Sequence, residues 1–577
     1  MSLTVGLTSI SANIFDINDA PFSRRGHWLS LGYINEPAGR VLCMRTARGA
    51  VYHRTLLKID VLRAGDSVPF ELRVEAGCIR LITPFGHADL ALTDTATLRI
   101  RIVQGLVLRV QMADQPYSSS LECKPGRWHL NLNASRTRLM ISALAGELQG
   151  HAPFIPGKSD TQPARLELSA TQGATHAELE ITEFESSWIR SAHRLGFDEI
   201  AGQATREFAE WFAAFGEFDA ESSRLARRAA FVLWTNTVPA EGNFAYPAVM
   251  MSRNALTGIW SWDHCFVALA LARAHPAQAW EQWWLPFKLQ TAEGMLPDAF
   301  TDSSREYAMT KPPVHGWALQ TILKFYQPTA DQLRQAYDAL ERWTNWWLTH
   351  RDDDGDGIAQ YNHGCESGWD NDSLCCGGLP CESADLSVYL IQQQQMLANL
   401  ARRLNREPDA IRWTAAAQAL TERLFAHSWR DGRFIAPRSG SHTLGVQGDC
   451  LRQFWPLLLG KALPEPVAAK LLKDLLEVGR FRTPYGFATE SPLSGYYKSN
   501  GYWLGPIWAP STYQVVEMLE LHGLHQEAKD AMRDFVRLCE QNGFRENYDA
   551  LTGDGLCDRG FAWTAAVCLD FIKRLET

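Results

Sequence analysis

Hydrophobic and polar residues alternate in short segments between about residues 25 and 190. Leu98, Ile100 and Ile102 are separated by single arginines, and the same period of two recurs over residues 177–181. Successive side chains of a strand point to opposite faces, so this period is typical of strands with one buried face. Short spacers that contain glycine separate the segments, which predicts an antiparallel sheet folded as a β-sandwich.

A longer period replaces this alternation after about residue 200. Hydrophobic residues recur every three or four positions over residues 333–347, 386–400 and 528–539. This spacing places them on one face of a helix, and about eleven such stripes lie between residue 205 and the end. The loops between them are rich in Gly, Asp, Pro and aromatic residues, and long loops in a compact domain are usually functional.

The change of period divides the chain into two structural regions. A chain of 577 residues is too long for one ordinary hydrophobic core, so more than one domain is expected. We predict a β-sandwich domain over residues 1–195, a linker helix region over residues 196–220, and an all-α domain over residues 221–577. The β-rich part carries no catalytic constellation, so candidate chemistry lies in the helical part.

Composition and charge exclude several classes of function. The net charge of −9 comes without a basic stripe, which argues against a nucleic-acid partner. No apolar stretch approaches the length of a membrane span. Residues 1–16 lack the features of a secretory signal, and the 12 Cys are irregularly spaced, so we expect a cytoplasmic protein with reduced thiols. The 21 Trp fit either a helical core or a sugar site, because indole rings stack on sugars.

Four loop segments combine carboxylates with aromatic residues, each at a predicted helix boundary. They are residues 259–264, 366–371, 501–508 and 545–553. Hydrolysis of a glycosidic bond with inversion needs one protonated and one ionised carboxyl, typically ~6.5–9.5 Å apart. Asp370 and Glu546 are the candidates for this pair. Arg545, next to Glu546 in the sequence, is expected to favour the ionised form of a base.

These segments, in this order, resemble those of glycoside hydrolase family 63. The resemblance covers roughly residues 240–577, and residues 367–371, 546–548 and 551–553 are its most specific matches. The family includes processing α-glucosidases and bacterial relatives that act on small glucosides and mannosides. The resemblance implies an (α/α)6 barrel preceded by a β-sandwich, with Asp370 as general acid and Glu546 as general base.

The resemblance also implies a set of substrate-binding residues. Trp262 and Asp263 resemble the family's sugar-binding Trp-Asp pair, in which Asp263 would bond hydroxyls of the sugar in the −1 pocket. The alternative for Asp263 is a helix N-cap, because an apolar helical run follows it. Each of the other aromatic residues could instead belong to the core. Pro312-Pro313 with Trp317 resembles another pocket-lining stretch of the family. The remaining predicted substrate-binding residues are Trp317, Trp369, Tyr502, Trp503, Gly505, Trp508 and Trp563.

An acidic loop precedes the candidate acid. Asp352, Asp354, Asp356 and Gly357 fit the start of a calcium-binding loop, because alternate carboxylates can converge on a hard cation. Position twelve of an EF-hand would be Glu, and here it is His363, so the loop is not an EF-hand. A solvated turn at the end of a helix is the alternative.

Some members of the family bind calcium at a similar loop with a further acid from a later segment. Glu382 or Asp385 could supply that acid. Calcium would be structural here, bracing the loop that leads to Asp370, and no cofactor is required for the chemistry.

The preferred function is therefore an exo-acting, inverting α-glycosidase, with an α-glucosidase as the default. Its substrate would be an α-linked disaccharide, a short oligosaccharide or a small glycoside. The alternatives are a trehalase-like enzyme, another inverting enzyme acting on an α-mannoside or α-galactoside, and a glycan-binding protein that has lost catalysis. The sequence leaves the −1 sugar, the aglycone and the oligomeric state open.

Overall fold

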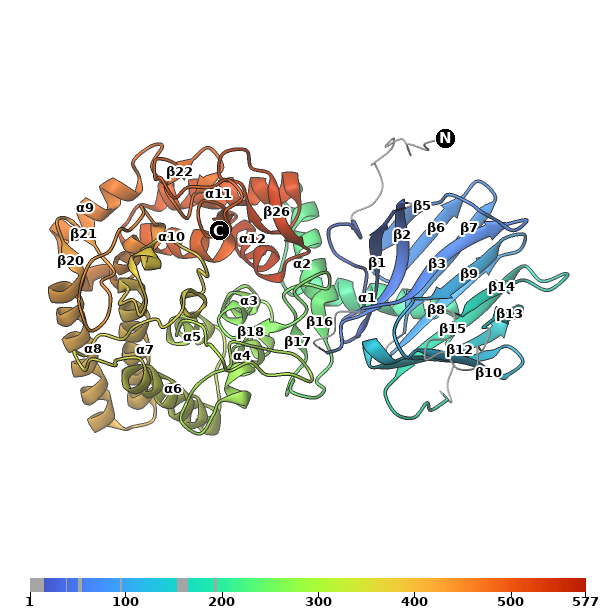
Figure 1. The fold of residues 1–577 in the computed structure, drawn as a ribbon, viewed down its shortest axis with the longest axis horizontal. Helices are drawn as coiled ribbons and strands as arrows, with labels where there is room; N and C mark the ends of the chain where they lie inside the picture. The colour runs from blue at the N-terminus through green and yellow to red at the C-terminus, as the bar shows by residue number, and fades with distance from the viewer. Residues whose placement is uncertain (1–14, 38, 50–53, 94–95, 153–163, 191–194) are drawn as a thin grey trace.

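The computed structural model describes residues 15–37, 39–49, 54–93, 96–152, 164–190 and 195–577. Two β-sheets lie at one end of the molecule and a ring of helices at the other (Figure 1). The chain passes from the sheets to the ring through α1 (Phe197–Ala213). The predicted linker region, residues 196–220, therefore contains a helix.

Two antiparallel sheets, of seven and eight strands among the described residues, form the β-rich part. The first has the order β1-β2-β3-β9-β14-β13, with β4 paired to β3, and the second has the order β10-β11-β12-β15-β8-β7-β6-β5. The strands are β1 (Leu29–Glu36), β2 (Gly39–Thr46), β3 (Thr55–Arg63), β4 (Asp66–Ser67), β5 (Glu71–Glu75), β6 (Cys78–Thr83), β7 (Gly86–Leu92), β8 (Thr97–Val103), β9 (Val107–Met112), β10 (Ser119–Lys124), β11 (Arg127–Leu132), β12 (Thr137–Ala145), β13 (Glu147–His151), β14 (Arg165–Ser169) and β15 (His176–Phe184).

The alternating pattern on β8 explains why this strand forms and which way it faces. Leu98, Ile100 and Ile102 are fully buried in the core between the sheets. Arg99 points to the other face and is also buried. There it pairs with Glu178 and donates to the carbonyl of Leu195, so its polar atoms are partnered. The predicted β-sandwich is confirmed, and the chain leading into α1 covers part of its outer face.

Helices make up most of the second part of the chain. They are α2 (Ser223–Asn236), α3 (Asp263–Leu271), α4 (Pro276–Trp284), α5 (His315–Ile322), α6 (Ala330–His350), α7 (Ala384–Arg403), α8 (Glu407–Ser428), α9 (Glu465–Leu475), α10 (Ala509–Leu521), α11 (His525–Asn542) and α12 (Ala562–Leu575). Of the 3-10 segments, η1 (Asn133–Ser135) lies between β11 and β12 in the β-rich part. The others, in the second part, are η2 (Pro286–Leu289), η3 (Gly364–Ser367), η4 (Leu374–Gly377) and η5 (Leu451–Ala462). The three hydrophobic stripes noted in the sequence lie on α6, α7 and α11.

Six of these elements, within the part of the chain that is described, close an inner ring. α3, α5, α7, η5, α10 and α12 contact one another in this order, and α12 returns to contact α3. The outer elements α2, α4, α6, α8, α9 and α11 pack against this ring. The arrangement is that of an (α/α)6 barrel, as predicted.

Short strand pairs connect the helices at the barrel. They are β16 (Thr237–Val238) with β17 (Ala248–Val249), β18 (Ile259–Trp260) with β19 (Ala299–Phe300), β20 (Trp429–Arg430) with β21 (Arg433–Phe434), and β22 (Arg482–Thr483) with β23 (Gly486–Phe487). A three-stranded sheet contains β24 (Ile507–Trp508), β25 (Arg545–Tyr548) and β26 (Gly555–Arg559). Its strand β25 contains Glu546, one of the two candidate carboxyls.

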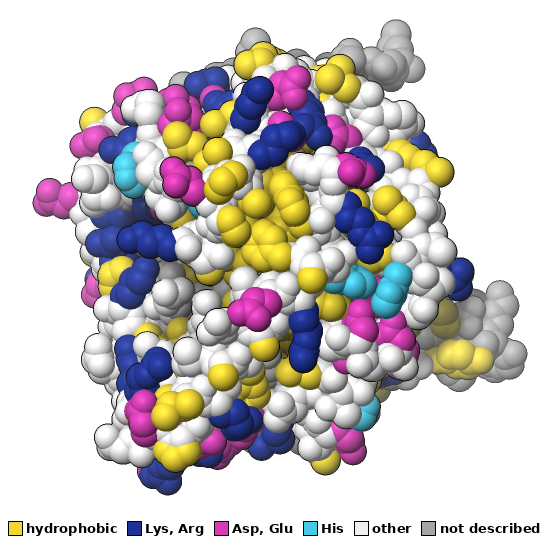
Figure 2. Space-filling view, turned by 90° about the vertical axis from the view of Figure 1, so that its left-hand side faces the viewer, with side chains coloured by type: hydrophobic (Ala, Val, Ile, Leu, Met, Phe, Trp, Pro, Cys, Tyr) yellow, Lys and Arg dark blue, Asp and Glu magenta, His cyan; other side chains and the backbone are white. Residues whose placement is uncertain are grey.

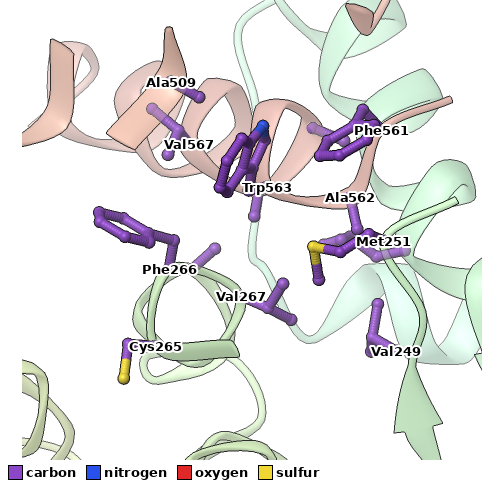
Figure 3. Close-up of a cluster of buried hydrophobic side chains, with 14 of the residues drawn as sticks. Val249, Met251, Cys265, Phe266, Val267, Ala509, Phe561, Ala562, Trp563 and Val567 are labelled. Carbon is purple, nitrogen blue, oxygen red and sulfur yellow. The ribbon is translucent and has the colours of Figure 1, made fainter. Parts of the chain in front are cut away.

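The inner helix α3 is buried on all sides because its neighbours in the ring and the outer helices enclose it. All nine residues of α3 are buried, as expected for a helix that is enclosed by protein. Figure 3 shows Phe266 and Val267 of α3 next to Trp563 and Val567 of α12. This packing between the first and last helices of the ring closes the barrel.

The β-sandwich packs directly on the barrel. Arg253 is buried and donates to the backbone carbonyls of His27 and Trp28, at 2.6 and 3.0 Å. Arg45 donates to the carbonyl of Asn254, 2.9 Å away, and Arg54 donates to the carbonyl of Ala255, also 2.9 Å away. Side chains of the sandwich therefore support the barrel loop around residues 253–255.

The face at the α8 and α9 side of the barrel mixes basic and acidic side chains around a central group of hydrophobic ones (Figure 2). None of the helices in the described segments has the length and apolar content that crossing a bilayer requires.

Candidate active site

A compact cavity of about 170 Å³ lies where the four predicted loop segments meet. Its size is below the ~300–1,000 Å³ of sites that hold drug-sized ligands, so it suits a small molecule. Each segment contributes at least one lining residue. The lining residues are Leu256, Trp260, Trp262, Asp263, Lys311, Gly368, Asp370, Tyr502, Trp503, Glu546, Phe561 and Trp563.

The three-stranded sheet brings the third and fourth segments together. Glu546 lies within β25 and not at a helix boundary, which differs from the sequence prediction. β25 pairs with β24, so that Asn547 lies opposite Trp508. Residues 502–508 thereby lie beside Glu546 and hold it at the cavity. No hydrophobic period marked this strand in the sequence, because it is only four residues long.

Two hydrogen bonds hold the carboxyl group of Glu546. The hydroxyl of Tyr502 donates to Oε1 at 2.9 Å, and the backbone N–H of Asp558 donates to Oε2 at 3.3 Å. Burial raises the pKa of Glu546 above its ordinary value, these two bonds oppose the rise, and the charges of Asp558 and Asp370 add to it.

Arg545 does not have the role predicted for it. Successive side chains of a strand point to opposite faces, so Arg545 and Glu546 diverge on β25. Asp19, Tyr548 and Asp558 are the acidic groups that influence Arg545. The ionised form of Glu546 is favoured instead by Tyr502 and the N–H of Asp558.

Asp370 faces the cavity beside a buried lysine. Its side chain is 33% exposed, and Oδ1 lies 3.5 Å from Nζ of Lys311. Lys311 also lies 3.2 Å from Asp298 and donates to the carbonyl of Cys365 at 2.8 Å. Burial alone would lower the pKa of Lys311, but the carboxylates of Asp370, Asp298 and Asp263 raise it above its ordinary value.

The sequence reasoning missed Lys311. The only signal was its position directly before Pro312-Pro313, a stretch that the resemblance had already indicated. Leu256 and Phe561 were also missed, because a single apolar residue in a loop does not differ from a core residue in sequence.

Asp263 is a buried carboxyl in the cavity wall. Burial raises its pKa well above the ordinary value, and the charge of Lys311 opposes this rise. Its Oδ2 atom is buried and has no hydrogen-bond partner among the described residues. The alternative N-cap role is wrong, because Trp262 occupies the N-cap position of α3 and no side chain caps this helix.

Aromatic rings form the wall and a second layer behind it. Trp262, Trp503, Trp563 and Tyr502 line the cavity. Trp508 stacks on Trp503 with centroids 4.0 Å apart. Trp369 also stacks on Trp503, at 4.7 Å. Trp369, Gly505 and Trp508 are not among the lining residues, so they support the wall and do not form it.

Trp317 lies in the core and does not join the predicted substrate-binding residues. It is 4% exposed, its ring packs on Phe266 and Tyr513, and its indole N–H donates to Glu517 at 2.6 Å. The resemblance of this stretch to the family predicted a pocket-lining Trp317, but α5 begins at His315 and carries Trp317 into the barrel interior.

A close backbone approach fixes the position of the Asp370 loop. Gly368 has a φ of +76°, and a Cβ atom added to it would lie 2.7 Å from the ring of Trp262. Only glycine combines this conformation with the contact. The loop that carries Asp370 therefore rests directly on the aromatic wall.

The predicted metal residues converge only in part. Asp352, Asp354 and Asp356 lie within 4.8 Å of one another through their possible ligand atoms. Glu382 joins Asp356, together with two histidines that the sequence reasoning missed, His427 and His442. The other proposed acid, Asp385, instead pairs with Arg452 at 3.1 Å and accepts from Tyr361.

Comparisons with known proteins match the barrel part of the chain to a family of glycoside hydrolases. Residues 257–564 match the model of the family described as the mannosylglycerate hydrolase MGH1-like glycoside hydrolase domain. A mannosylglycerate hydrolase of Rubrobacter radiotolerans is 25% identical over 54% of this chain and 90% of its own length. A glucosylglycerate hydrolase of Mycolicibacterium hassiacum is 25% identical over 61% of this chain and 98% of its own length.

Solved structures share the fold. The GH63 mannosylglycerate hydrolase of Thermus thermophilus in complex with glucose superposes with a TM-score of 0.52 at 22% identity, over 60% of this chain and 99% of that chain. A bacterial glucoamylase complexed with acarbose superposes with a TM-score of 0.65 at 10% identity, over 97% of this chain and 94% of that chain. Because the family model matches more than half of the chain, this protein belongs to the MGH1-like family and is a glycoside hydrolase related to family 63, as its motifs predicted.

Proposed function

We propose that this enzyme hydrolyses an α-glycosidic bond with inversion, acting on the non-reducing end of a small glycoside. Asp370 is the general acid and Glu546 the general base. The observation that carries the proposal is that both carboxyls face one compact cavity whose walls are largely aromatic. An inverting glycosidase needs at least two carboxyl groups that face the space occupied by the sugar.

The surroundings of each carboxyl suit its role. Asp370 is partly exposed to the cavity, so it can reach the glycosidic oxygen and protonate the leaving group. Glu546 must be ionised to accept a proton from water, and the hydroxyl of Tyr502 and the N–H of Asp558 stabilise that charge in a buried position. Asp263, which lines the cavity, would bond a hydroxyl of the sugar in the −1 pocket.

The substrate that the proposal favours is a hexose α-linked to glycerate. Two relatives are named as mannosylglycerate and glucosylglycerate hydrolases. The small cavity favours a short aglycone. Lys311 places a positive charge beside Asp370 in the cavity lining, and a carboxylate on the aglycone would benefit from it.

A substrate panel tests this proposal. Glucosylglycerate, mannosylglycerate, trehalose, and methyl and nitrophenyl α-glucosides, α-mannosides and α-galactosides are each incubated with the enzyme, and released monosaccharide is measured. We expect the two glycerate compounds to have the highest kcat/KM. Faster release from trehalose would favour the trehalase-like alternative, and release from none would favour a glycan-binding protein. The configuration of the first-formed sugar is followed by NMR, and a retained anomer would contradict the mechanism.

Tyr502→Phe should shift the pH dependence of hydrolysis. Activity is lost as the pH falls through the pKa of the base, and the Tyr502 hydroxyl lowers that pKa. A hydrogen bond to a charged group is worth about 1.5–3 kcal/mol, so its loss should move the acidic limb upward by about 1–2 pH units. The measurement is the pH profile of kcat/KM. An unmoved acidic limb would mean that this bond does not tune the base.

Asp263→Ala should lower kcat/KM by about 10–100-fold, the loss expected for a hydrogen bond to a charged group. The melting temperature should not fall much, because Oδ2 has no hydrogen-bond partner among the described residues. Steady-state kinetics and a thermal melt distinguish a substrate-binding role of Asp263 from a structural role. A lower melting temperature with unchanged kinetics would assign Asp263 a structural role.

A further inference from the structure

Four side chains from separate segments meet outside the cavity, on the far side of the loop that leads to Asp370. Asp356 follows α6, Glu382 precedes α7, His427 lies in the last turn of α8, and His442 lies in the loop that follows β21. One possible ligand atom from each lies within 4.8 Å of the others. Residues so far apart in sequence meet only because α7 and α8 pack together.

Glu382 is the most informative member of this cluster. Its side chain is fully buried, and neither carboxylate oxygen has a hydrogen-bond donor among the described residues. Nε2 of His427 lies 2.7 Å from Oε2, yet the two atoms do not have the geometry of a hydrogen bond. A buried carboxylate without donors is costly, and a bound cation is one way to satisfy it.

Asp356 and the two histidines meet at the same place, where Nε2 of His442 also forms a hydrogen bond with Oδ2 of Asp354 at 2.9 Å. Oδ1 of Asp356 accepts from the N–H of Ile358, which leaves Oδ2 facing the cluster. This Oδ2 lies 3.5 Å from Nδ1 of His427 and 3.5 Å from Nε2 of His442. Neighbouring ligand atoms around a tetrahedral zinc ion at about 2.0–2.1 Å are separated by ~3.3 Å, close to these two spacings. Oε2 of Glu382 lies farther from Nε2 of His442, at 4.0 Å.

The donors fit a transition ion better than calcium. Calcium takes 6–8 oxygen ligands, and imidazole nitrogens are not among them. Oδ2 of Asp352 accepts from the N–H of Gly357, while its Oδ1 is buried without a hydrogen-bond partner among the described residues. Oδ2 of Asp354 accepts from the N–H of Gly440 and bonds with His442. Two imidazoles with two carboxylates are the donors that zinc and its neighbours in the transition series prefer.

We propose that Asp356, Glu382, His427 and His442 bind a divalent transition-metal ion, for which Zn²⁺ is the probe. Four protein ligands fill a tetrahedral shell, so the site is structural and leaves no open position for a substrate. The ion joins the end of α8 to the segment before α7 and to the acidic loop that precedes Asp370. The proposal is independent of the glycosidase mechanism proposed above.

Metal binding to the full-length protein tests it. The protein is dialysed against a chelator, and Zn²⁺ or Ca²⁺ is added back while metal content and melting temperature are measured. We expect one Zn²⁺ per chain, a melting temperature that rises by a few degrees, and Ca²⁺ bound at least ~10-fold more weakly. Co²⁺ in the same site should give the visible absorption of a tetrahedral ion.

Variants locate the ion. His442→Gln should abolish stoichiometric Zn²⁺ binding and the melting shift, and it should fold, because this side chain is 40% exposed. His525→Gln, an exposed histidine on α11, is the matched control and should bind as the unaltered chain does. Glu382→Gln changes the buried carboxylate of the site and should likewise abolish stoichiometric Zn²⁺ binding. Binding of no metal, tighter binding of Ca²⁺, or full Zn²⁺ binding by His442→Gln would each overturn the proposal.

Discussion

Asp370→Asn should lower kcat/KM for a glycoside with a poor leaving group by about 10³-fold or more. General acid catalysis contributes typically 10²–10⁴-fold, and an amide cannot donate its proton to the glycosidic oxygen as a carboxylic acid does. A substrate with a good leaving group, such as a nitrophenyl glycoside or a glycosyl fluoride, needs little protonation. The loss for such a substrate should therefore be much smaller, and steady-state kinetics on both substrate types measures the difference.

Asp338→Asn is the matched control for this variant. Its side chain is 57% exposed on the outer helix α6, and it should change neither the rate nor the melting temperature. Equal losses for good and poor leaving groups in Asp370→Asn would remove Asp370 from the acid role. Near-normal turnover of the substrate with the poor leaving group would show that Asp370 takes no part in catalysis.

Glu546→Gln should lower kcat by about 10²–10⁴-fold for every substrate, whatever the leaving group. The amide cannot accept a proton from water, and a better leaving group does not supply a base. The replacement has the same shape, and its amide oxygen can still accept the hydrogen bond from Tyr502. We therefore expect a melting temperature close to that of the unaltered enzyme, so that the loss is chemical.

The comparison between the two variants separates their roles. Glu477→Gln, with a side chain 60% exposed, is the control for the glutamate change and should be active. Recovery of Glu546→Gln with an activated leaving group would indicate that Glu546 is not the base. The acidic limb of the pH profile should also disappear in this variant, because that limb reports the protonation of the base.

Much of the fold was readable from the period of the hydrophobic positions. The alternation at Leu98, Ile100 and Ile102 predicted β8, and all three side chains are buried between the sheets. The stripe over residues 333–347 predicted α6, which a capping box between Thr329 and Gln332 begins. Periods of two and 3.6 residues reflect which side chains share one face, and that is a local property of the chain.

Contacts between distant residues were not readable in this way. Arg545 is next to Glu546 in sequence but points to the other face of β25, while Tyr502 and Asp558 hold the carboxyl group. Trp317 was assigned to the pocket from its neighbours and lies in the core. Sequence adjacency suggested the role of Arg545 and a family resemblance suggested that of Trp317, and in both cases the direction of the side chain decided otherwise.

The metal ligands around the acidic loop were also not readable from the sequence alone. Alternate aspartates predicted a hard cation, because carboxylate spacing is visible in a short stretch. His427 and His442 change the donor set, and no spacing rule links them to Asp356. The identity of a metal depends on every ligand, and ligands from separate segments are known only when the helices are packed.

The sequence by itself determined the two-part architecture, the four loops and the two carboxyls, because periodicity and motif composition are local. Tertiary structure alone decided that Asp370 lies beside Lys311, that Tyr502 holds Glu546, and that Asp263 is a buried carboxyl in the cavity wall. These relations join residues from different elements of the barrel. Their geometry depends on how α3, the β24–β26 sheet and the loop at Gly368 pack against one another, and no local pattern encodes that packing.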